Sequence, residues 1–440
     1  MRLNLRPITS LLIGVALLLA GNGLQFTLVP LRGSTEGFGP LTLGLIGSAY
    51  FVGFVSGCML GPYIVLRAGH IRTFAAMVAI TASIALAYAL APLPLPWAAF
   101  RAATGFALAV LYLVIESWLN DHATNATRGI VMSAYIIVNF AALTVGQMLV
   151  TVYPIDQAKS FMLAAMLLSL ASVPVALTRS AQPAPITIVS FRPKQLFVAA
   201  PVALVAPFMI GLANGAFWSL APIFVSSNGL DVQRAAQFMT AAVVAGALVQ
   251  WPVGRLSDRF DRRRVLLVLL VGAVGTSIAL WLVPASGALL LALGALFGAL
   301  ALPGYSLAAA HGYDKTPASD MVATAATILL ASGLGSIAGP PVAALLMSGQ
   351  GPSTLFLFTA IVEALLAAYL LYRIRVQASL EPPQKTGFDL GATAPVGGVV
   401  TTGIPDPQDP PVAVPRDYGR EERPAAEDAG APLREAKARE

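Results

Sequence analysis

The sequence predicts an all-α membrane protein whose twelve transmembrane helices form two repeated six-helix bundles. The first observation is composition: 57% of the residues are apolar and only 11% are charged, whereas a soluble domain carries about 25% charged residues. The second is a series of apolar runs of spanning length. The third is a set of polar and glycine positions that recurs at a nearly constant offset. A mean hydropathy of +0.76 over the whole chain excludes a water-soluble fold.

Apolar runs of about 20 residues are long enough to cross the hydrocarbon core of a bilayer. The first run, residues 8–31, follows a short basic segment and is longer than the apolar core of a cleaved signal peptide, so we expect a retained helix. Eleven further runs are predicted at 41–66, 72–92, 95–119, 129–153, 159–178, 196–226, 231–254, 264–284, 286–311, 320–348 and 352–374.

Basic residues in the connecting segments indicate the orientation. Sixteen Lys and Arg residues fall on the side of the N-terminus, and three, Arg32, Lys159 and Arg234, fall on the other side. Short cytoplasmic loops are enriched in these residues. The sequence therefore predicts a multi-pass protein of a bacterial cytoplasmic (inner) membrane with both termini in the cytoplasm. This orientation accounts for the basic residues, so the net charge of +6 does not indicate that the protein binds nucleic acid.

Two halves of the chain repeat each other at an offset of 192 or 193 residues. The matching positions are Asn22 and Asn214, Gly23 and Gly215, Pro30 and Pro222, Gly105 and Gly298, and Gly146 and Gly339. This order predicts an N-terminal six-helix bundle at 1–178, a cytoplasmic linker at 179–195 and a C-terminal six-helix bundle at 196–375. Residues 376–440 are rich in Pro, Gly and charge, and we expect a disordered cytoplasmic tail.

A dense cluster of charge stands between the eighth and ninth apolar runs. Residues 254–263 read GRLSDRFDRR, which resembles the loop signature of the major facilitator superfamily, written G-x-L-x-D-R-x-G-R-R. Asp261 stands where the family prefers glycine. The corresponding segment of the first half keeps Arg67 and Gly69, but it has Leu66 in place of the aspartate.

Further motifs extend the resemblance over residues 8–375. They are Arg101-x-x-x-Gly105 in the fourth run and Gly335-x-x-x-Gly339-Pro340 in the eleventh. The sequences VIES at 114–117, Gly146-Gln147 and QWPVGRL at 250–256 resemble the bacterial YcaD-type branch of the family. Gln147 departs from the proline that antiporters of the family carry there. The resemblance implies a secondary transporter that works by alternating access, with its substrate site between the bundles.

Arg101 lies about one turn inside the fourth predicted helix, past Trp97, which we expect at the membrane interface. An arginine inside a membrane helix faces the bundle interior or a watery cavity. It is therefore a candidate for binding an anionic group of the substrate. The alternative is a structural residue whose long side chain reaches the outer surface.

Two carboxylates inside membrane helices are candidates for proton coupling. Glu116 lies about 22 Å beyond Arg101 along the same helix and could load and release a proton, or else pair with loop arginines. Glu363 stands near the centre of the last helix, where proton coupling and a structural role are the alternatives. His311 closes the tenth helix and is expected to be solvated.

Polar and aromatic residues interrupt the helices that line the cavity in this family. The substrate-binding candidates are Arg101, Gln25, Trp218, Tyr112, Tyr305, Asn22 and Asn214. Interhelical hydrogen bonding is the alternative. The adjacent glycines favour it for Asn22 and Asn214, whereas Gln25 and Trp218 are assigned to the cavity.

The resemblance also implies a gate built from the charged motif. Its expected members are Gly254, Asp258, Arg259, Arg262 and Arg263, together with Arg67 and Gly69. Asp258 is expected near the N-terminus of a neighbouring helix, where the helix dipole favours negative charge, and the arginines are expected to pair across the interface between the bundles. The alternative is charge that only sets the orientation. Gly105, Gly335, Gly339 and Pro340 are expected to allow close helix packing and a kink.

The sequence lacks the residues that several classes of function require. The single cysteine, Cys58, permits no disulfide within the chain, and there is no phosphate-binding Gly-Lys loop or His-Glu-x-x-His motif. We therefore expect no enzyme, no cofactor and no metal site. The expected protein is a monomeric, proton-coupled secondary transporter that exports a small organic solute. The alternatives are an uncoupled facilitator, or a transporter fold that senses a ligand or binds a partner through its tail.

Overall fold

The computed structural model describes residues 6–123, 127–177, 183, 190–283, 287–377 and 385–388. All of its regular elements in these ranges are helices, and the described residues belong to one compact unit, Met1–Thr402. Most of the predicted linker and tail lies outside the described residues. The elements are α1 (Arg6–Thr35), α2 (Pro40–Ala68), α3 (His70–Leu90), α4 (Pro94–His122), α5 (Arg128–Leu149), α6 (Lys159–Leu170), α7 (Ser172–Ala176), α8 (Pro193–Ala199), α9 (Pro201–Ser227), α10 (Val232–Arg259), α11 (Arg262–Leu282), α12 (Gly287–Ala301), α13 (Gly304–Asp314), the 3-10 turn η1 (Ala318–Asp320), α14 (Met321–Gln350) and α15 (Thr354–Val376).

Twelve segments in the described part of the chain are long and apolar enough to cross a membrane, which confirms the predicted number of spans. Two of these spans are interrupted: Lys159–Ala176 divides at Ala171 into α6 and α7, and Gly287–Asp314 divides into α12 and α13. A third predicted helix is also divided, although only its second part, α9, is a span. Ala200 adopts φ −145° and ψ 73° immediately before Pro201, so the predicted helix 196–226 divides into α8 and α9. The turn at Leu302 and Pro303 divides the tenth span into α12 and α13.

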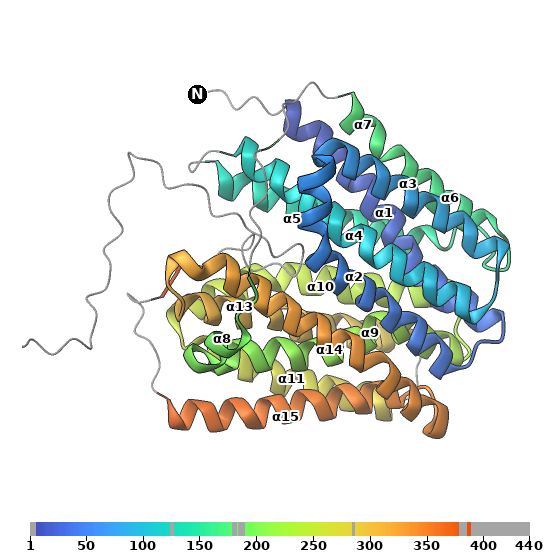
Figure 1. Ribbon diagram of the computed structural model, residues 1–440. Coiled ribbons are helices and arrows are strands. Elements are labelled where there is room, and N and C mark those ends of the chain that lie inside the picture. Colours follow the sequence, from blue (N-terminus) through green and yellow to red (C-terminus); the bar gives the residue numbers. More distant parts are fainter. Residues whose placement is uncertain are drawn as a thin grey trace, which may run out of the picture. The chain divides into compact units, whose positions relative to one another are not determined.

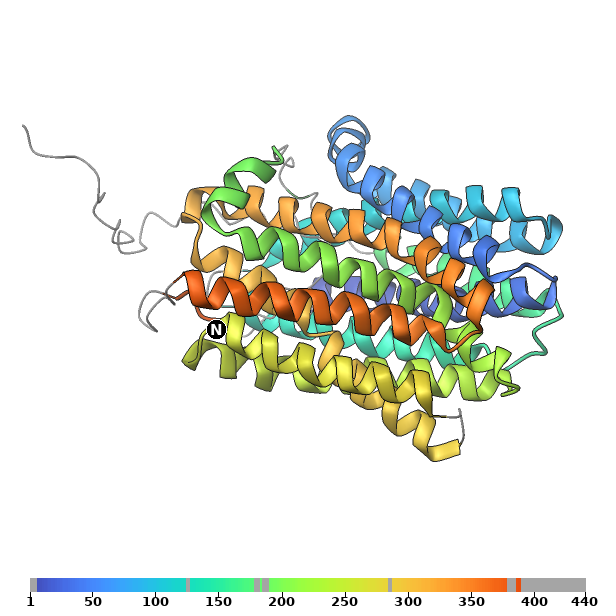
Figure 2. The ribbon, with the colours of Figure 1, turned by 90° about the horizontal axis from the view of Figure 1, so that it is seen from below.

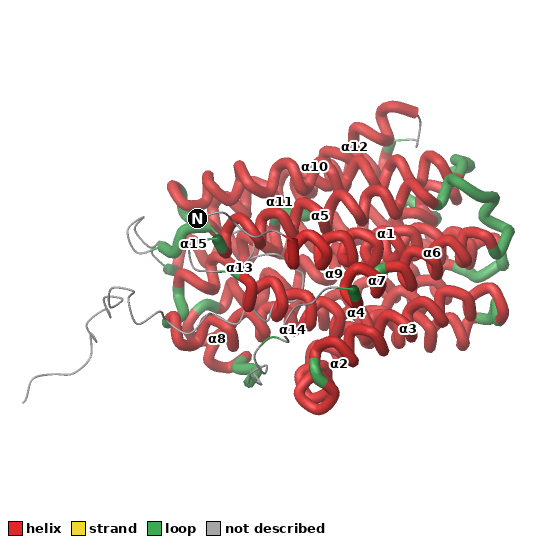
Figure 3. The backbone as a smooth tube through the Cα atoms, turned by 90° about the horizontal axis from the view of Figure 1, so that it is seen from above, coloured by secondary structure: helices red, strands yellow, loops and turns green. Residues whose placement is uncertain are grey.

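The helices run side by side, with α1–α7 in one layer and α8–α15 in the other (Figures 1 and 2). Helix α2 packs against α14 and helix α5 against α10, which joins the layers. Figure 3 shows the same helices from above, with short loops at both ends. We call the end at which α1 begins and α15 ends the termini end, on the left of Figure 1, and the opposite end the far end.

Close backbone contact repeats in the two layers at the offset that the sequence contains. A Cβ atom added at Gly105 of α4 would lie 2.0 Å from the carbonyl oxygen of Tyr50 on α2. The matching Gly298 of α12 would meet the carbonyl oxygen of Ala242 on α10, also at 2.0 Å. Both contacts require glycine, because any side chain would overlap backbone.

A second pair of contacts follows the same rule. A Cβ atom at Gly146 of α5 would lie 2.1 Å from the carbonyl oxygen of Ala20 on α1. At the matching Gly339 of α14, it would lie 2.0 Å from the carbonyl oxygen of Leu212 on α9. Equivalent glycines therefore join equivalent helices, and the chain builds one helical arrangement twice.

Replacing Gly339 by alanine is expected to lower the free energy of unfolding by about 1–3 kcal/mol, because the methyl group overlaps the α9 backbone. Thermal denaturation of the detergent-purified protein, followed by size-exclusion chromatography, measures the effect. The matched control is Gly349→Ala on the same helix, where an added Cβ meets nothing within 4 Å. Equal melting temperatures for the two variants would contradict the packing role of Gly339.

Candidate functional site

A cavity of about 220 Å³ lies between the two layers, near the middle of the helices. Both halves of the chain contribute to its wall. The lining residues are Asn22, Phe26, Tyr50, Phe51, Phe54, Tyr112, Asn139, Phe140, Leu143, Asn214, Trp218, Gly246, Gln250, Leu302, Tyr305, Leu329, Ser332, Gly333 and Ser336. This is the combination of apolar wall and few polar groups that is typical of small-molecule sites.

Aromatic rings form much of the wall and contact one another across the two halves. The Phe26 ring lies 4.9 Å from that of Tyr50, in an edge-to-face arrangement, and 5.8 Å from that of Trp218, between ring centroids. Amides interrupt this aromatic surface, and Gln250 Nε2 donates a hydrogen bond of 2.7 Å to Ser306 Oγ. None of the described residues that line the cavity is charged.

Five of the seven predicted substrate-binding residues lie in this wall: Asn22, Tyr112, Asn214, Trp218 and Tyr305. Asn22 and Asn214 line the cavity, whereas the glycines next to them in the sequence had favoured a role in interhelical hydrogen bonding. Gln25 is fully buried on α1, outside the lining, and neither polar atom of its amide has a hydrogen-bond partner among the described residues.

Arg101 lies behind the wall. Only 3% of the residue is exposed, and its Cζ atom lies 4.7 Å from the ring centroid of Phe26 and 4.9 Å from that of Tyr50. The guanidinium group thus supports two lining rings through cation–π contacts. Trp97 differs from its expected place at the membrane interface: it is fully buried and donates from Nε1 to the carbonyl of Tyr88 at 3.2 Å.

Glu116 is buried on α4, one helical turn beyond the cavity-lining Tyr112. The hydroxyl of Tyr135 on α5 donates to its Oε1 atom at 3.5 Å. The alternative pairing with a loop arginine is not seen, since no ion pair of Glu116 occurs in the described part of the chain. The carboxylate therefore lies beside the cavity with a hydroxyl donor.

Glu363 has a different environment, in the contact between α15 and α11. Ser277 Oγ donates to its Oε2 atom at 3.1 Å, and Thr359 Oγ1 donates to Ser277 Oγ at 3.1 Å. These polar partners were not apparent from the sequence around Glu363. His311 is 6% exposed, so the expectation that it is solvated was wrong.

The charged motif is mostly helical, which corrects the expectation of a loop. Helix α10 continues to Arg259 and helix α11 begins at Arg262, so that only Phe260 and Asp261 connect them. Asp258 lies in the last turn of α10, and its Oδ1 atom lies 3.2 Å from Nη1 of Arg262, the first residue of α11. The cap of α11 is Asp261, which accepts from the backbone nitrogen of Arg263 at 2.9 Å.

Arg262 and Arg263 pair within the C-terminal half, whereas we expected the arginines of the motif to pair across the interface between the bundles. Arg259 is exposed and forms no ion pair with the described residues. Arg262 Nε lies 2.6 Å from Asp314 Oδ2, at the end of α13, and its Nη1 lies 3.2 Å from Asp258 Oδ1. Arg263 Nη2 lies 2.8 Å from Asp261 Oδ2 and also donates to the carbonyl of Gln377 at 3.0 Å. The network ties the ends of α10, α11, α13 and α15 together.

Asp261 keeps its charge over the neutral pH range. Burial alone raises the pKa of this carboxyl, but the hydrogen bonds from the side chain and backbone of Arg263 outweigh burial, and the pKa lies below its usual value. The ionised carboxylate therefore stabilises the folded state at neutral pH. That contribution is lost only as the pH falls through the lowered pKa.

The corresponding segment of the N-terminal half forms no such network with the part of the chain that the structure describes. Gly69 adopts φ +80°, a left-handed conformation that favours glycine, and its nitrogen donates to the carbonyl of Val65 at 2.8 Å to end α2. Arg67 is exposed beside it and forms no ion pair with the described residues.

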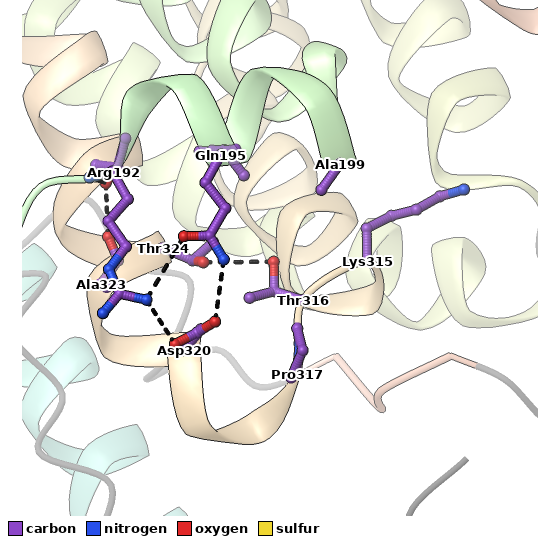
Figure 4. Close-up of a pocket in the computed structure, with 11 residues that line it drawn as sticks. Arg192, Gln195, Ala199, Lys315, Thr316, Pro317, Asp320, Ala323 and Thr324 are labelled. Carbon is purple, nitrogen blue, oxygen red and sulfur yellow. Dashed lines mark hydrogen bonds and ion pairs between the residues drawn. The ribbon is translucent and has the colours of Figure 1, made fainter. Parts of the chain in front are cut away.

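The linker is attached to the C-terminal half at its second end. Arg192 Nη1 lies 2.9 Å from Asp320 Oδ1, and Gln195 Nε2 donates to Asp320 Oδ2 at 3.2 Å (Figure 4). The backbone nitrogen of Arg192 donates to Thr327 Oγ1 at 3.0 Å. The adjacent pocket is only about 40 Å³, which suits anchoring of the chain rather than binding of a solute.

Comparison with known families agrees with this arrangement. A profile of the Major Facilitator Superfamily matches residues 11–311 and again residues 203–433. The chain belongs to the major facilitator superfamily. Its function is therefore the transport of a solute across a membrane.

The similar proteins include bacterial relatives that carry the name expected from the motifs. The protein described as the uncharacterized MFS-type transporter YcaD of Escherichia fergusonii is 28% identical over 377 residues, which cover 85% of this chain and 97% of that protein. YcaD of Escherichia coli O7:K1 is 29% identical over 377 residues, covering 84% and 96%. The resemblance to the YcaD-type branch is confirmed.

Solved structures share the fold at low identity. The nucleoside transporter NupG superimposes with a TM-score of 0.73 at 15% identity, over 84% of this chain and 100% of that one. A bacterial homolog to the human lysosomal transporter Spinster gives a TM-score of 0.70 at 14% identity, over 85% and 98%. The predicted fold class is thereby confirmed.

Several lining residues were missed by sequence reasoning. Phe26, Tyr50, Phe51 and Phe54 read as ordinary apolar residues, although the run of aromatic residues at 50–54 was an available signal. Gln250 was noticed only as part of a motif.

Replacing Arg262 by glutamine is expected to lower the free energy of unfolding by about 3–5 kcal/mol, because buried Asp314 loses its counter-charge. Thermal melting in detergent measures the change. Arg264→Gln, two positions away on the exposed side of α11, is the control and should melt close to wild type. An unchanged melting temperature for Arg262→Gln would contradict the stabilising role of the network.

Proposed function

We propose that this protein is a proton-coupled secondary transporter that exports a small organic solute from the bacterial cytoplasm by alternating access. The observation that carries the proposal is the cavity at the contact of two repeated halves, since transporters built from repeats bind their substrates there. One chain supplies both walls of the cavity, which supports a monomer as the working unit.

The contacts between the halves support an inward-open state. On the side of the cavity that faces the far end, Ser48 Oγ of α2 donates to the carbonyl of Ile337 on α14 at 2.5 Å. Nearby, a Cβ atom at Gly44 would lie 2.8 Å from the carbonyl oxygen of Pro340. With the termini in the cytoplasm, as the loop charges predict, these contacts close the outer side and leave the cytoplasmic side to open and close.

The cavity wall supports an uncharged substrate with a planar aromatic part. Rings such as Trp218 and Tyr112 offer stacking faces, while the amides of Asn22, Asn214 and Gln250 offer hydrogen bonds. A permanently charged solute would find no counter-ion among the described lining residues. Arg101 then contributes from behind the rings of Phe26 and Tyr50, without direct contact to the substrate.

Glu116 is the residue we assign to proton coupling. It is buried beside the cavity, and Tyr135 links it to α5, which contacts α10 of the other half. Gain or loss of a proton by Glu116 therefore changes the charge beside the cavity and beside the α5–α10 contact, which has to move during alternating access. Glu363 lies within the C-terminal half, where its hydrogen bonds to α11 support a structural role.

A thermal-shift screen should find stabilisation by uncharged aromatic solutes ahead of small anions, sugars or amphipathic cations. A ligand at about 100 times its Kd raises the free energy of unfolding by about 2.7 kcal/mol. The shift is expected to vanish in Trp218→Ala and to persist in the control Trp251→Ala, an exposed tryptophan outside the cavity. An anion hit that disappears in Arg101→Ala would overturn the proposed substrate class.

Glu116→Gln is expected to lose transport driven by a pH gradient by about tenfold or more, while substrate exchange without a gradient continues, because the variant cannot release a proton. Flux of a substrate from the screen into proteoliposomes measures both. The matched control, Glu363→Gln, should retain gradient-driven flux. Coupling like that of wild type in Glu116→Gln would remove this residue from the mechanism and favour an uncoupled facilitator.

A further inference from the structure

A four-residue segment of the C-terminal tail, Lys385-Thr386-Gly387-Phe388, lies against the charged motif. We call it the tail tetrapeptide. It contacts the last turn of α10, the first turn of α11 and the end of α13. This contact differs from the expectation of a disordered tail, at least for these four residues.

Lys385 occupies the C-terminal end of α10. Its Nζ donates to the carbonyl of Phe260 at 2.6 Å and lies 3.4 Å from the carbonyl oxygen of Ser257 and 3.5 Å from that of Asp258. The last carbonyls of a helix have no partners within the helix, and a cation there also interacts favourably with the helix dipole. Lys385 is therefore a cap supplied from a segment more than 100 residues away.

Thr386 joins the buried ion pair of the motif. Its backbone nitrogen donates to Asp314 Oδ1 at 3.0 Å and its hydroxyl donates to the same oxygen at 2.8 Å. Its carbonyl oxygen accepts a hydrogen bond from Arg262 Nη2. The backbone of the tail thus completes the hydrogen bonding of Arg262 and Asp314.

Phe388 lies on the glycine of the motif. Its backbone nitrogen donates to Asp258 Oδ1 at 3.0 Å, and a Cβ atom at Gly254 would lie 2.2 Å from its ring. The ring can therefore occupy this position only because residue 254 is glycine. The two motif residues Gly254 and Asp258 form a binding site for one aromatic residue of the same chain.

The ring also lies on the side of α10 that continues the cavity wall. Gly246 and Gln250 line the cavity, and Gly254 follows at the same spacing of four residues, so it lies about 6 Å further toward the termini end on a neighbouring part of that face. Phe388 is therefore placed at the termini-end approach to the cavity.

The corresponding positions of the other half differ at two of these three contact residues. At the repeat offset of 192, Gly254 corresponds to Pro62 and Asp258 to Leu66, whereas Asp314 corresponds to Asp121 at the offset of 193 that Gly105 and Gly298 show. Pro62 and Leu66 offer neither a carboxylate for the N–H group of Phe388 nor a glycine against which its ring can pack. These differences in side chains explain why the tail tetrapeptide contacts the C-terminal half rather than the N-terminal half.

We propose that residues 385–388 are an internal ligand of the 254–262 surface and act as a plug that restricts entry to the cavity from the termini end. Closing of that end during alternating access requires the α10 face to approach the other half, so the plug has to leave at each cycle. Docking of the tail thus slows transport until it is released. This inference rests on the proposed termini-end opening, but neither of its tests requires a known substrate.

Hydrogen–deuterium exchange of the full-length protein in detergent tests the docking. The amides of Thr386 and Phe388 donate to carboxylates, so they should exchange at least about tenfold more slowly than in an unstructured chain. Gly254→Ala should restore free-chain exchange, whereas the control Gly275→Ala, where an added Cβ meets nothing within 4 Å, should not. Fast exchange in wild type, or protection that survives in Gly254→Ala, would overturn the site.

Cysteine labelling tests the plug. In a chain with Cys58→Ser and Ser332→Cys, the new thiol lies in the cavity wall, and its rate of reaction with a small maleimide reports access. A chain that ends after Phe388 should react as slowly as the full-length chain. A chain that ends after Gln384, or one with Phe388→Ala, should react several-fold faster. Equal rates in all four chains would overturn the plug, whatever the outcome of the transport assays.

Discussion

Close backbone contact between paired helices is the constraint on which the rest of the structure depends. Association within a bilayer removes no apolar surface from water, so helices gain stability through contact and small residues at their interfaces. Gly105 and Gly146 provide this contact in the first half, and Gly298 and Gly339 provide it in the second. Because the same contacts occur twice, the same bundle forms twice, and the cavity lies where the two copies meet.

Charge is arranged around this frame in two different ways. In the C-terminal half, Arg262 and Asp314 are both buried and satisfy each other at the termini end. In the N-terminal half, Arg101 and Glu116 are buried, form no ion pair with the described residues, and lie beside the uncharged cavity wall. The first arrangement fixes the ends of four helices. The second leaves charge close to the substrate path, where solute binding and protonation can change its environment.

The proposed substrate cavity and the proposed plug use successive turns of one face of α10. Gly246 and Gln250 of α10 line the cavity, and Gly254 and Asp258 of the same helix hold Phe388. A motif read first as a gate between bundles therefore has a second role in this conformation, as a receptor for the chain's own tail. Release of the tail and closing of the termini end are then parts of one movement, since both act on the same residues.

The sequence by itself determined the number of spans, the repeat and the family, because spanning length, apolar composition and glycine spacing are properties of the chain alone. Only the tertiary structure decided where the polar residues point. The side chain of Asn22 lines the cavity, whereas those of Gln25 on the same helix and Arg101 on α4 do not. That outcome depends on the rotation of each helix against its neighbours. The docking of residues 385–388 depends on it as well, since α10, α11 and α13 form the tail's binding surface only after they pack together.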